Sequence, residues 1–465
     1  MTDLTRLEKD SIGELEVPVD AYYGVQSLRG AQNFRILDRK LDPHFIKNMA
    51  RIKKAAATVN RDIGLLDAKK ADAIIKACDE ITAGHFLDAF IVDAIQGGAG
   101  TSANMNANEV IANRAIELLG GRKGDYSIVH PNDEVNMAQS TNDVIPTAGK
   151  MTMIDLLHPL LNSLKNLRDA LLVKAEELDD VVKMGRTQMQ DAVPIRLGQE
   201  FTAYATVLSR DIKRISFAEQ EMHAINLGGS AIGTSVNVDP AYLARIAPTL
   251  SEVAGYSLTC ADDLIDATQN LDSFAVVSSA LKACAIDLSK IANDLRLMSS
   301  GPRTGFGEIN LPPKQNGSSI MPGKVNPVIP EVVNQVAFLV MGHDLTISMV
   351  IEGGQLELNA FEPVLFDQLF ESITALTAAV DTFTINCIRG ITANRKKCRE
   401  NVENSTGVIT ALVPVIGYQR AADIAKESLK TGESVRSILL REQLIDPARL
   451  ESILDPVAMT EARKI

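Results

Sequence analysis

The chain has 465 residues, of which 46% are hydrophobic and 23% charged, a composition that suits a globular protein with a large core. Its formal net charge of −12 argues against nucleic acid and anionic membrane surfaces as partners. No apolar run follows Met1, none approaches the roughly 20 residues of a membrane span, and the five cysteines show no CxxC or metal spacing. We therefore expect a cytoplasmic protein with reduced thiols.

The first part of the chain predicts an arm followed by helices. Residues 1–45 have an irregular pattern that favours an arm with a short strand pair. Apolar residues then recur at helical spacing, and helices are expected over 44–60, 66–83 and 103–119.

Four long apolar stripes follow, with steps that alternate between three and four residues. The clearest runs from Phe274 to Met298 over about three heptads, and the others lie within 157–178, 197–215 and 333–347. These stripes predict long helices packed in a bundle. Helices of this length often bury a face against another subunit, so we expect a homo-oligomer.

After about residue 391 the chain becomes polar and basic, and later apolar spacing predicts a small helical C-terminal domain. The expected organisation has three parts. They are an N-terminal mostly helical domain over 1–140, a central long-helix bundle over 141–394 and the small domain over 395–465.

The stretch richest in chemistry is 317–327, Gly-Ser-Ser-Ile-Met-Pro-Gly-Lys-Val-Asn-Pro. In an extended segment Lys324 and Asn326 point to the same side, where a cation and an amide make a good carboxylate clamp. Ser318 and Ser319 would point opposite ways, which suits two different roles. The same residue types also build ordinary surface loops.

Three other polar loops stand before predicted helices. They contain Thr101-Ser102, Ser140-Thr141-Asn142 and the segment 185–188, which precedes a helix expected to begin at Pro194. A helix N-terminus offers unpaired N–H groups and a dipole that favours anions. Each loop taken singly is most simply a helix cap, but four such loops predict one anion site lined by hydroxyls and amides.

The residue types at this site restrict its chemistry. The six histidines lack zinc spacing, and neither a GxSxG motif nor a phosphate-binding P-loop occurs. Hydroxyls, amides and one lysine suit a dicarboxylate that gains charge when a proton leaves the carbon beside a carboxylate. Preorganised donors can lower such a barrier by ~3 kcal/mol each. Loss of a leaving group from the neighbouring carbon then yields an alkene.

Four blocks resemble signatures of the aspartase/fumarase superfamily: 97–109, 136–143, 185–200 and 317–327. The resemblance implies a mostly α, three-domain subunit whose central bundle of long helices forms the core of a homotetramer. It also implies that each site is built from three subunits. Similarity to the aspartase branch implies reversible deamination of L-aspartate to fumarate and ammonia, without an organic cofactor. We expect no metal site.

The resemblance assigns roles to matching positions. Ser318, as an alkoxide, resembles the general base that takes the Cβ proton, and Lys324 is the second expected catalytic residue. Donors to the carboxylate that becomes an enediolate are implied at Thr101, Ser140, Thr141 and Ser319. Together with Lys324, the clamp on the other carboxylate is implied at Thr187 and Asn326. Contacts near the leaving amine are implied at Asn142 and Gln188.

Two alternatives stay open. Fumarate hydratase of the class II type shares the 317–327 loop, and the segment 130–133 resembles an anion site typical of it. Gln188 favours the aspartase branch, because hydratases of this type carry a histidine there, and the segment 330–335 favours it too. The other alternative is a catalytically silent helical scaffold, against which the retained loop residues argue.

Overall fold

The computed structural model describes residues 4–462, which form a mostly helical chain with four two-stranded sheets. The mostly α prediction is therefore confirmed. The chain divides into two compact units. The first contains Met1–Leu161, Arg214–Ala283 and Leu339–Ala375, and the second contains Asn162–Lys213, Cys284–Phe338 and Leu376–Ile465. The division into three consecutive domains stays a prediction.

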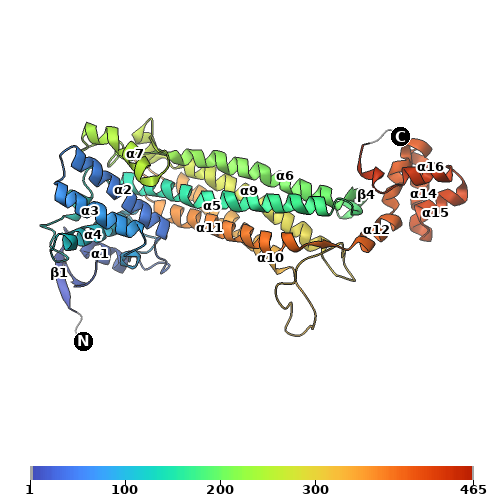
Figure 1. Ribbon diagram of the computed structural model, residues 1–465, viewed down its shortest axis with the longest axis horizontal. Coiled ribbons are helices and arrows are strands. Elements are labelled where there is room, and N and C mark those ends of the chain that lie inside the picture. The colour runs from blue at the N-terminus through green and yellow to red at the C-terminus, as the bar shows by residue number, and fades with distance from the viewer. Residues whose placement is uncertain (1–3, 463–465) are drawn as a thin grey trace. The chain divides into compact units, whose positions relative to one another are not determined.

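The first unit begins with a strand pair, in which β1 (Thr5–Lys9) and β2 (Glu14–Pro18) are antiparallel. A strand pair was expected within 1–45, but the rest of that segment is not all irregular, because it also contains a helix. Its shorter helices are α1 (Val25–Asn33), α2 (Pro43–Asp62), α3 (Ala68–Thr82), α4 (Thr101–Leu118), α7 (Pro240–Ala254) and α8 (Leu264–Gln269). The parallel strands β5 (Ala224–Ile225) and β6 (Thr259–Cys260) complete it. Figure 1 shows α2 between α3 and α7, both of which it contacts.

Local chemistry explains where the helices of the first unit begin. Asp42 accepts a hydrogen bond from the backbone N–H of His44, and Pro43 occupies the first turn of α2. Asp67 caps α3 in the same manner through Lys69 and Lys70. The helices predicted over 44–60, 66–83 and 103–119 correspond to α2, α3 and α4.

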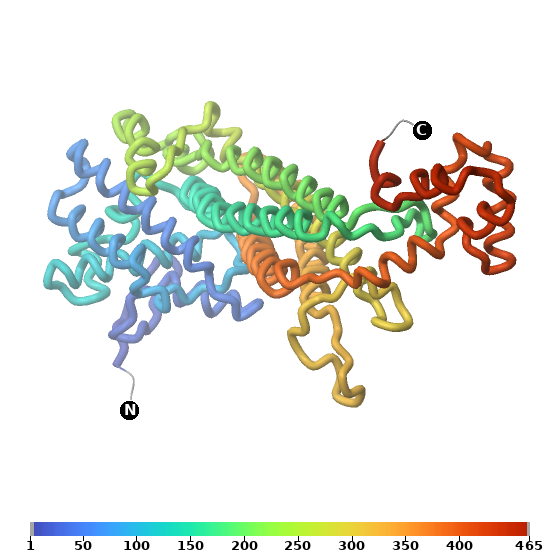
Figure 2. Tube along the Cα trace, turned by 45° about the vertical axis from the view of Figure 1, so that its right-hand side comes forward, coloured from blue at the N-terminus to red at the C-terminus, as the bar shows by residue number. Residues whose placement is uncertain are grey.

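Five long helices contribute residues to both units. They are α5 (Thr141–Glu177), α6 (Leu197–Glu219), α9 (Asp272–Met298), α10 (Val328–Glu352) and α11 (Glu362–Asn386). The predicted stripe of α9 is buried throughout, with no member more than 6% exposed. Both Figure 1 and Figure 2 show α5 and α6 side by side. The four stripes read from the sequence are therefore confirmed as helical packing faces.

Among the described helices, α10 is long and apolar enough to cross a membrane, judged by length and composition alone. Polar residues such as Asn334, His343 and Asp344 interrupt its apolar residues, so it is not a continuous apolar run. The core helix of a globular protein has the same length and composition. In α10 the buried Asp344 pairs with Lys282 and accepts a hydrogen bond from Ser278, and the buried His343 bonds Ser372. Buried polar side chains with protein partners are typical of a helix packed inside a protein.

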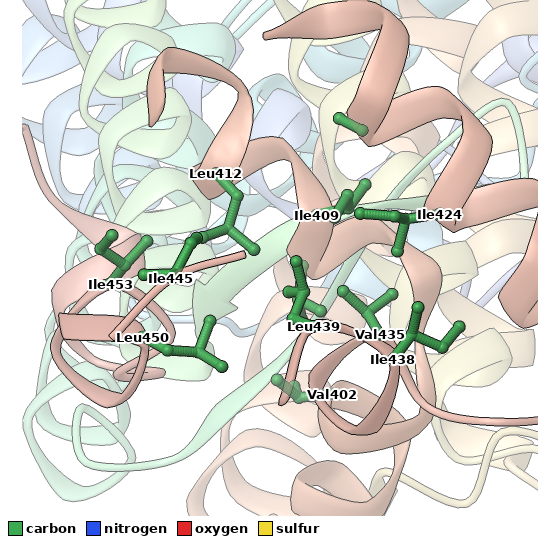
Figure 3. Packing of buried hydrophobic residues seen from close by; sticks show 12 residues of the cluster. Val402, Ile409, Leu412, Ile424, Val435, Ile438, Leu439, Ile445, Leu450 and Ile453 are labelled. Atoms are coloured by element: carbon green, nitrogen blue, oxygen red, sulfur yellow. The ribbon is translucent and has the colours of Figure 1, made fainter. Parts of the chain in front are cut away.

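The second unit contains two antiparallel strand pairs, β3 (Val182–Thr187) with β4 (Gln190–Arg196) and β7 (Ile309–Asn310) with β8 (Thr392–Ala393). Its shorter helices are α12 (Arg395–Asn404), α13 (Val413–Ile416), α14 (Tyr418–Thr431), α15 (Val435–Glu442) and α16 (Pro447–Ile453). Figure 3 shows the apolar cluster that joins them, with Leu412, Ile438 and Leu450 at 0% exposure. Val182 of β3 packs against this cluster, so the C-terminal helices hold the base of the β3–β4 hairpin.

Candidate active site

The serine loop, residues 317–327, is the second part of the connection between β7, which ends at Asn310, and α10, which begins at Val328. It belongs to the second unit. It closes on itself, since Gly317 N–H donates to the Lys324 carbonyl at 2.9 Å and Asn326 Nδ2 donates to the Gly317 carbonyl at 2.8 Å. A Cβ on Gly317 would lie 2.3 Å from the Lys324 carbonyl oxygen, so this approach requires glycine. Figures 1 and 2 both show the loop extending away from the start of α10.

The side-chain oxygen of Ser318 is held by two backbone N–H groups of the serine loop. Its Oγ accepts hydrogen bonds from the backbone N–H groups of Ile320 at 3.2 Å and Met321 at 3.1 Å. Two fixed N–H donors on one hydroxyl oxygen are the arrangement that stabilises an oxyanion. Ser319 and Lys324 are exposed, whereas Ser318 and Asn326 are half-buried.

In the first unit, α4 and α5 begin close together. Thr101 is the first residue of α4, and its Oγ1 donates to the Gly98 carbonyl at 2.7 Å. To donate to a ligand, this hydroxyl must rotate away from Gly98. A Cβ on Gly100, whose φ is +86°, would lie 3.0 Å from the side chain of Ile145 in α5. The two helix starts are thus held in contact.

The start of α5 is the donor loop, residues 140–143. Ser140 Oγ accepts from Asn142 N–H at 3.2 Å, and Asp143 Oδ1 accepts from Ser140 N–H at 2.9 Å, so the two residues cap the helix reciprocally. Thr141 Oγ1 accepts from Asn104 Nδ2 of α4 at 3.2 Å. Ser140, Thr141 and Asn142 are half-buried. The predictions that α4 and α5 start at these polar loops are confirmed.

A second glycine-rich segment, residues 226–231, supports the donor loop. Asp143 Oδ2 accepts from the N–H groups of Gly228 and Ser230, both at 3.0 Å, and Asn142 Nδ2 donates to the Ala231 carbonyl at 2.7 Å. Burial raises the pKa of Asp143 to about 6, against the lowering effect of its backbone donors and of Lys53. Sequence reading did not single out this segment, although its Gly-Gly-Ser run was a usable signal.

Thr187 and Gln188 lie at the tip of the β3–β4 hairpin and are exposed. The turn residues Gln188 and Met189 have φ of 53° and 64°, which match the left-handed conformation of a two-residue hairpin turn. The expected helix start at Pro194 is wrong, because Pro194 pairs with Met184 inside β4 and α6 begins at Leu197. Proline fits there because a two-stranded sheet has an outer edge that needs no N–H donor.

A buried ion cluster anchors this hairpin within the second unit. Glu308 is 0% exposed. Its Oε1 accepts a hydrogen bond from Arg186 Nη1 at 2.8 Å, and its Oε2 lies 3.3 Å from Lys183 Nζ. Lys183 also contacts Glu200 at 3.0 Å. Because Glu308 directly precedes β7, the cluster joins the hairpin to the strand that leads, through residues 311–316, into the serine loop.

The ten predicted site residues fall into two groups. Those of the first unit are Thr101, Ser140, Thr141 and Asn142. They lie at the starts of α4 and α5, which are in contact. Those of the second unit are Thr187, Gln188, Ser318, Ser319, Lys324 and Asn326, carried by the hairpin tip and the serine loop. Within residues 4–462, no three His, Cys, Asp or Glu side chains gather in a way that could hold a metal ion.

Comparison with known families defines the class of this protein. The profile of a family described as Lyase matches residues 13–342, and one described as Fumarase C C-terminus matches residues 408–461. The chain therefore belongs to this lyase family, and the resemblance to the aspartase/fumarase superfamily is confirmed.

Individual relatives agree with this membership. An aspartate ammonia-lyase from Bacillus sp is 52% identical over 455 residues, which cover 98% of this chain and 97% of the relative. A solved structure described as fumarate lyase:delta crystallin, from Brucella melitensis, is 48% identical with a TM-score of 0.96 and covers 99% of this chain and 100% of that one. A class II fumarase from Schistosoma mansoni has a TM-score of 0.95 but is 33% identical, with 98% and 99% of the chains covered.

Proposed function

We propose that this protein is an aspartate ammonia-lyase, which splits L-aspartate reversibly into fumarate and ammonia. Two relatives with that name are 52% and 51% identical to this chain and each covers 98% of it, whereas the class II fumarase is 33% identical. Gln188 also favours ammonia loss, because a glutamine cannot shuttle the proton that hydration of fumarate requires. The retained serine loop argues against a silent scaffold.

The observation that carries the mechanism is the pair of backbone N–H groups on Ser318 Oγ. A serine hydroxyl is a weak base at neutral pH, so its alkoxide must be stabilised before it can accept a proton. In the proposed step the Ser318 alkoxide takes a proton from Cβ of L-aspartate. The electrons of the broken C–H bond move into the neighbouring carboxylate, which becomes an enediolate with a second negative charge.

The other site residues hold the two ends of the substrate. The enediolate receives hydrogen bonds from hydroxyl groups of Thr101, Ser140, Thr141 and Ser319. The second carboxylate is clamped by Thr187, Lys324 and Asn326. When the enediolate collapses, the electron pair forms the Cα–Cβ double bond and the C–N bond breaks, so the substrate ammonium leaves as ammonia beside Asn142 and Gln188.

We propose a homotetramer with sites shared between subunits. One face of α10 supports it, because Phe338, Leu345 and Met349 recur at steps of seven and four and are each more than 60% exposed. A second copy of the chain would cover this face. Light scattering at micromolar concentration should give four times the chain mass, and a monomer would refute the assembly. The five free cysteines support a cytoplasmic location.

The function is tested by following the ultraviolet absorbance of fumarate. The purified protein should generate fumarate from L-aspartate and should not do so from L-malate. The opposite pattern would move the assignment to a hydratase, and no product from either substrate, together with no dicarboxylate binding by calorimetry, would favour a silent scaffold.

A further inference from the structure

Behind the donor loop lies a buried lysine that the proposed reaction does not use. Lys53 of α2 is 0% exposed, and its Nζ donates to Asn136 Oδ1 at 2.7 Å. A buried charge is costly unless its partners are well placed. When Lys53 is protonated it can only donate hydrogen bonds. The orientation of the Asn136 amide that presents Oδ1 to Lys53 is also the one in which Asn136 Nδ2 donates to the Gln139 carbonyl.

Asn136 in turn fixes the orientation of two asparagine side chains of α4. Its Oδ1 also accepts from Asn104 Nδ2 and Asn108 Nδ2, both at 3.2 Å, while its own Nδ2 donates to the Gln139 carbonyl at 3.1 Å. The Oδ1 atoms of Asn104 and Asn108 are buried and receive no hydrogen bond from the described residues. Their orientation is therefore set by Asn136 and not by a donor to their own oxygens.

A hydrogen bond from Asn104 connects this network to Thr141 of the donor loop. Asn104 Nδ2 donates to Thr141 Oγ1 at 3.2 Å, so the Thr141 oxygen accepts from the protein and its own hydrogen is left for a ligand. If the Asn104 amide were reversed, its oxygen would take that hydrogen and Thr141 would present a lone pair to the substrate carboxylate.

We propose that Lys53, Asn136 and Asn104 form a relay of positioning residues that keeps the Thr141 hydroxyl a hydrogen-bond donor for the enediolate. This inference rests on the proposed function, which places a carboxylate at Thr141. The relay acts most strongly when the second negative charge forms, because a correctly oriented donor stabilises a dianion more than the carboxylate of the bound substrate.

The chain offers a matched pair of variants. Asn104 and Asn108 lie one turn apart on α4, are both buried and both donate to Asn136 Oδ1, but only Asn104 contacts Thr141. Asn104→Leu should lower kcat for L-aspartate by about 10- to 100-fold with KM changed less than about threefold. Asn108→Leu should leave kcat within about threefold of wild type.

A double-mutant cycle separates the relay from a general packing effect. In a Thr141→Val background, Asn104→Leu should cause no further loss of kcat, because the residue through which it acts is already gone. Lys53→Met provides a second test. Alone it should lower kcat by a similar factor to Asn104→Leu, and combined with Thr141→Val it should cause no further loss of kcat. Equal losses in the two asparagine variants, or losses that multiply with Thr141→Val, would overturn the relay.

Two readouts keep this test independent of the proposed function. Thermal midpoints of all variants identify those that fail to fold, and each kcat is compared with wild type on whichever substrate the wild type converts. If the wild type fails to deaminate L-aspartate, the proposed function fails. If it succeeds and the asparagine variants behave alike, only the relay fails.

Discussion

The donor loop and the serine loop carry similar residues, but they are held in different ways. Residues 140–143 form hydrogen bonds with α4 and with the segment 226–231, and the last of them, Asp143, is fully buried. Residues 317–327 bond mainly to one another, and Ser319 and Lys324 are exposed. The first region is preorganised by its surroundings. The second carries its own oxyanion-stabilising geometry on a segment whose hydrogen bonds, within the described part of the chain, are mainly internal.

The difference separates two parts of the catalytic task. Donors for the enediolate act best when they are fixed before charge develops. A base that must reach Cβ can lie on a loop that closes over the substrate, provided that its N–H donors travel with it. Changes to the serine loop should therefore affect turnover with little effect on folding, whereas loss of Lys53 or Asn104 beneath the donor loop should affect both.

The largest effect is expected for Ser318→Ala. Without the hydroxyl no group remains to take the Cβ proton, so turnover of L-aspartate should fall by about a thousandfold or more while the thermal midpoint stays unchanged. Fumarate formation under saturating substrate measures this. Ser319→Ala serves as the control and should lose much less, because it removes one donor and not the base. Activity of Ser318→Ala near that of wild type would refute the assignment.

The second largest effect is expected when Lys324 loses the ammonium group that clamps the substrate carboxylate. Lys324→Met should raise KM for L-aspartate by about 10- to 100-fold, since a charge-assisted hydrogen bond to a carboxylate contributes about 1.5–3 kcal/mol. Lys314 is exposed on the segment that leads into the serine loop and provides a matched control. If Lys314→Met and Lys324→Met raise KM equally, general electrostatic attraction and not a clamp explains the effect.

Glycines of the serine loop allow a smaller test of its geometry. Gly317→Ala places a methyl group 2.3 Å from the Lys324 carbonyl oxygen and must open the loop, so kcat should fall about tenfold. Gly323 has φ of +80° but no atom within 4 Å of an added Cβ. Gly323→Ala should thus cost only the ~1–2 kcal/mol of a left-handed alanine, and an equal loss of kcat in both variants would contradict the steric argument.

The smallest effect concerns stability beneath the donor loop. Burial lowers the pKa of Lys53 from 10.5 to about 7, although Asp143 and Cys78 oppose this. Between these values the unfolded chain binds more protons than the folded one, so the free energy of unfolding rises with pH. Relative to Lys53→Met, wild type should gain about 1 kcal/mol between pH 8 and 9. Urea unfolding midpoints at both pH values measure it, and a constant difference would show that Lys53 does not titrate there.

Sequence reading located the elements that depend on local pattern. The stripes of α5, α6, α9 and α10 were visible because apolar side chains repeat at helical spacing, and polar loops marked the starts of α4, α5 and α10. The helices α7 and α11 were not singled out. The β3–β4 hairpin was missed because Gln188 and Met189 adopt positive φ without the glycine or asparagine that usually signals such a turn.

The support beneath the donor loop could not be predicted in the same way. Lys53, Asn104, Asn136 and Thr141 are separated by up to 88 positions in the sequence, and nothing in their local pattern indicates that they share hydrogen bonds. Segment 226–231 likewise reaches Asp143 only through the fold. Burial and long-range contact, not residue type, select these positions.

The most direct test of the account is a crystal structure of Ser318→Ala with L-aspartate bound, since a variant without its base should retain the substrate. We expect one carboxylate of the ligand to accept hydrogen bonds from Ser140 and Thr141 and the other to contact Lys324 and Asn326, with residue 318 facing Cβ. A ligand that engages only one of these two groups, or an assembly in which they line no common cavity, would contradict it.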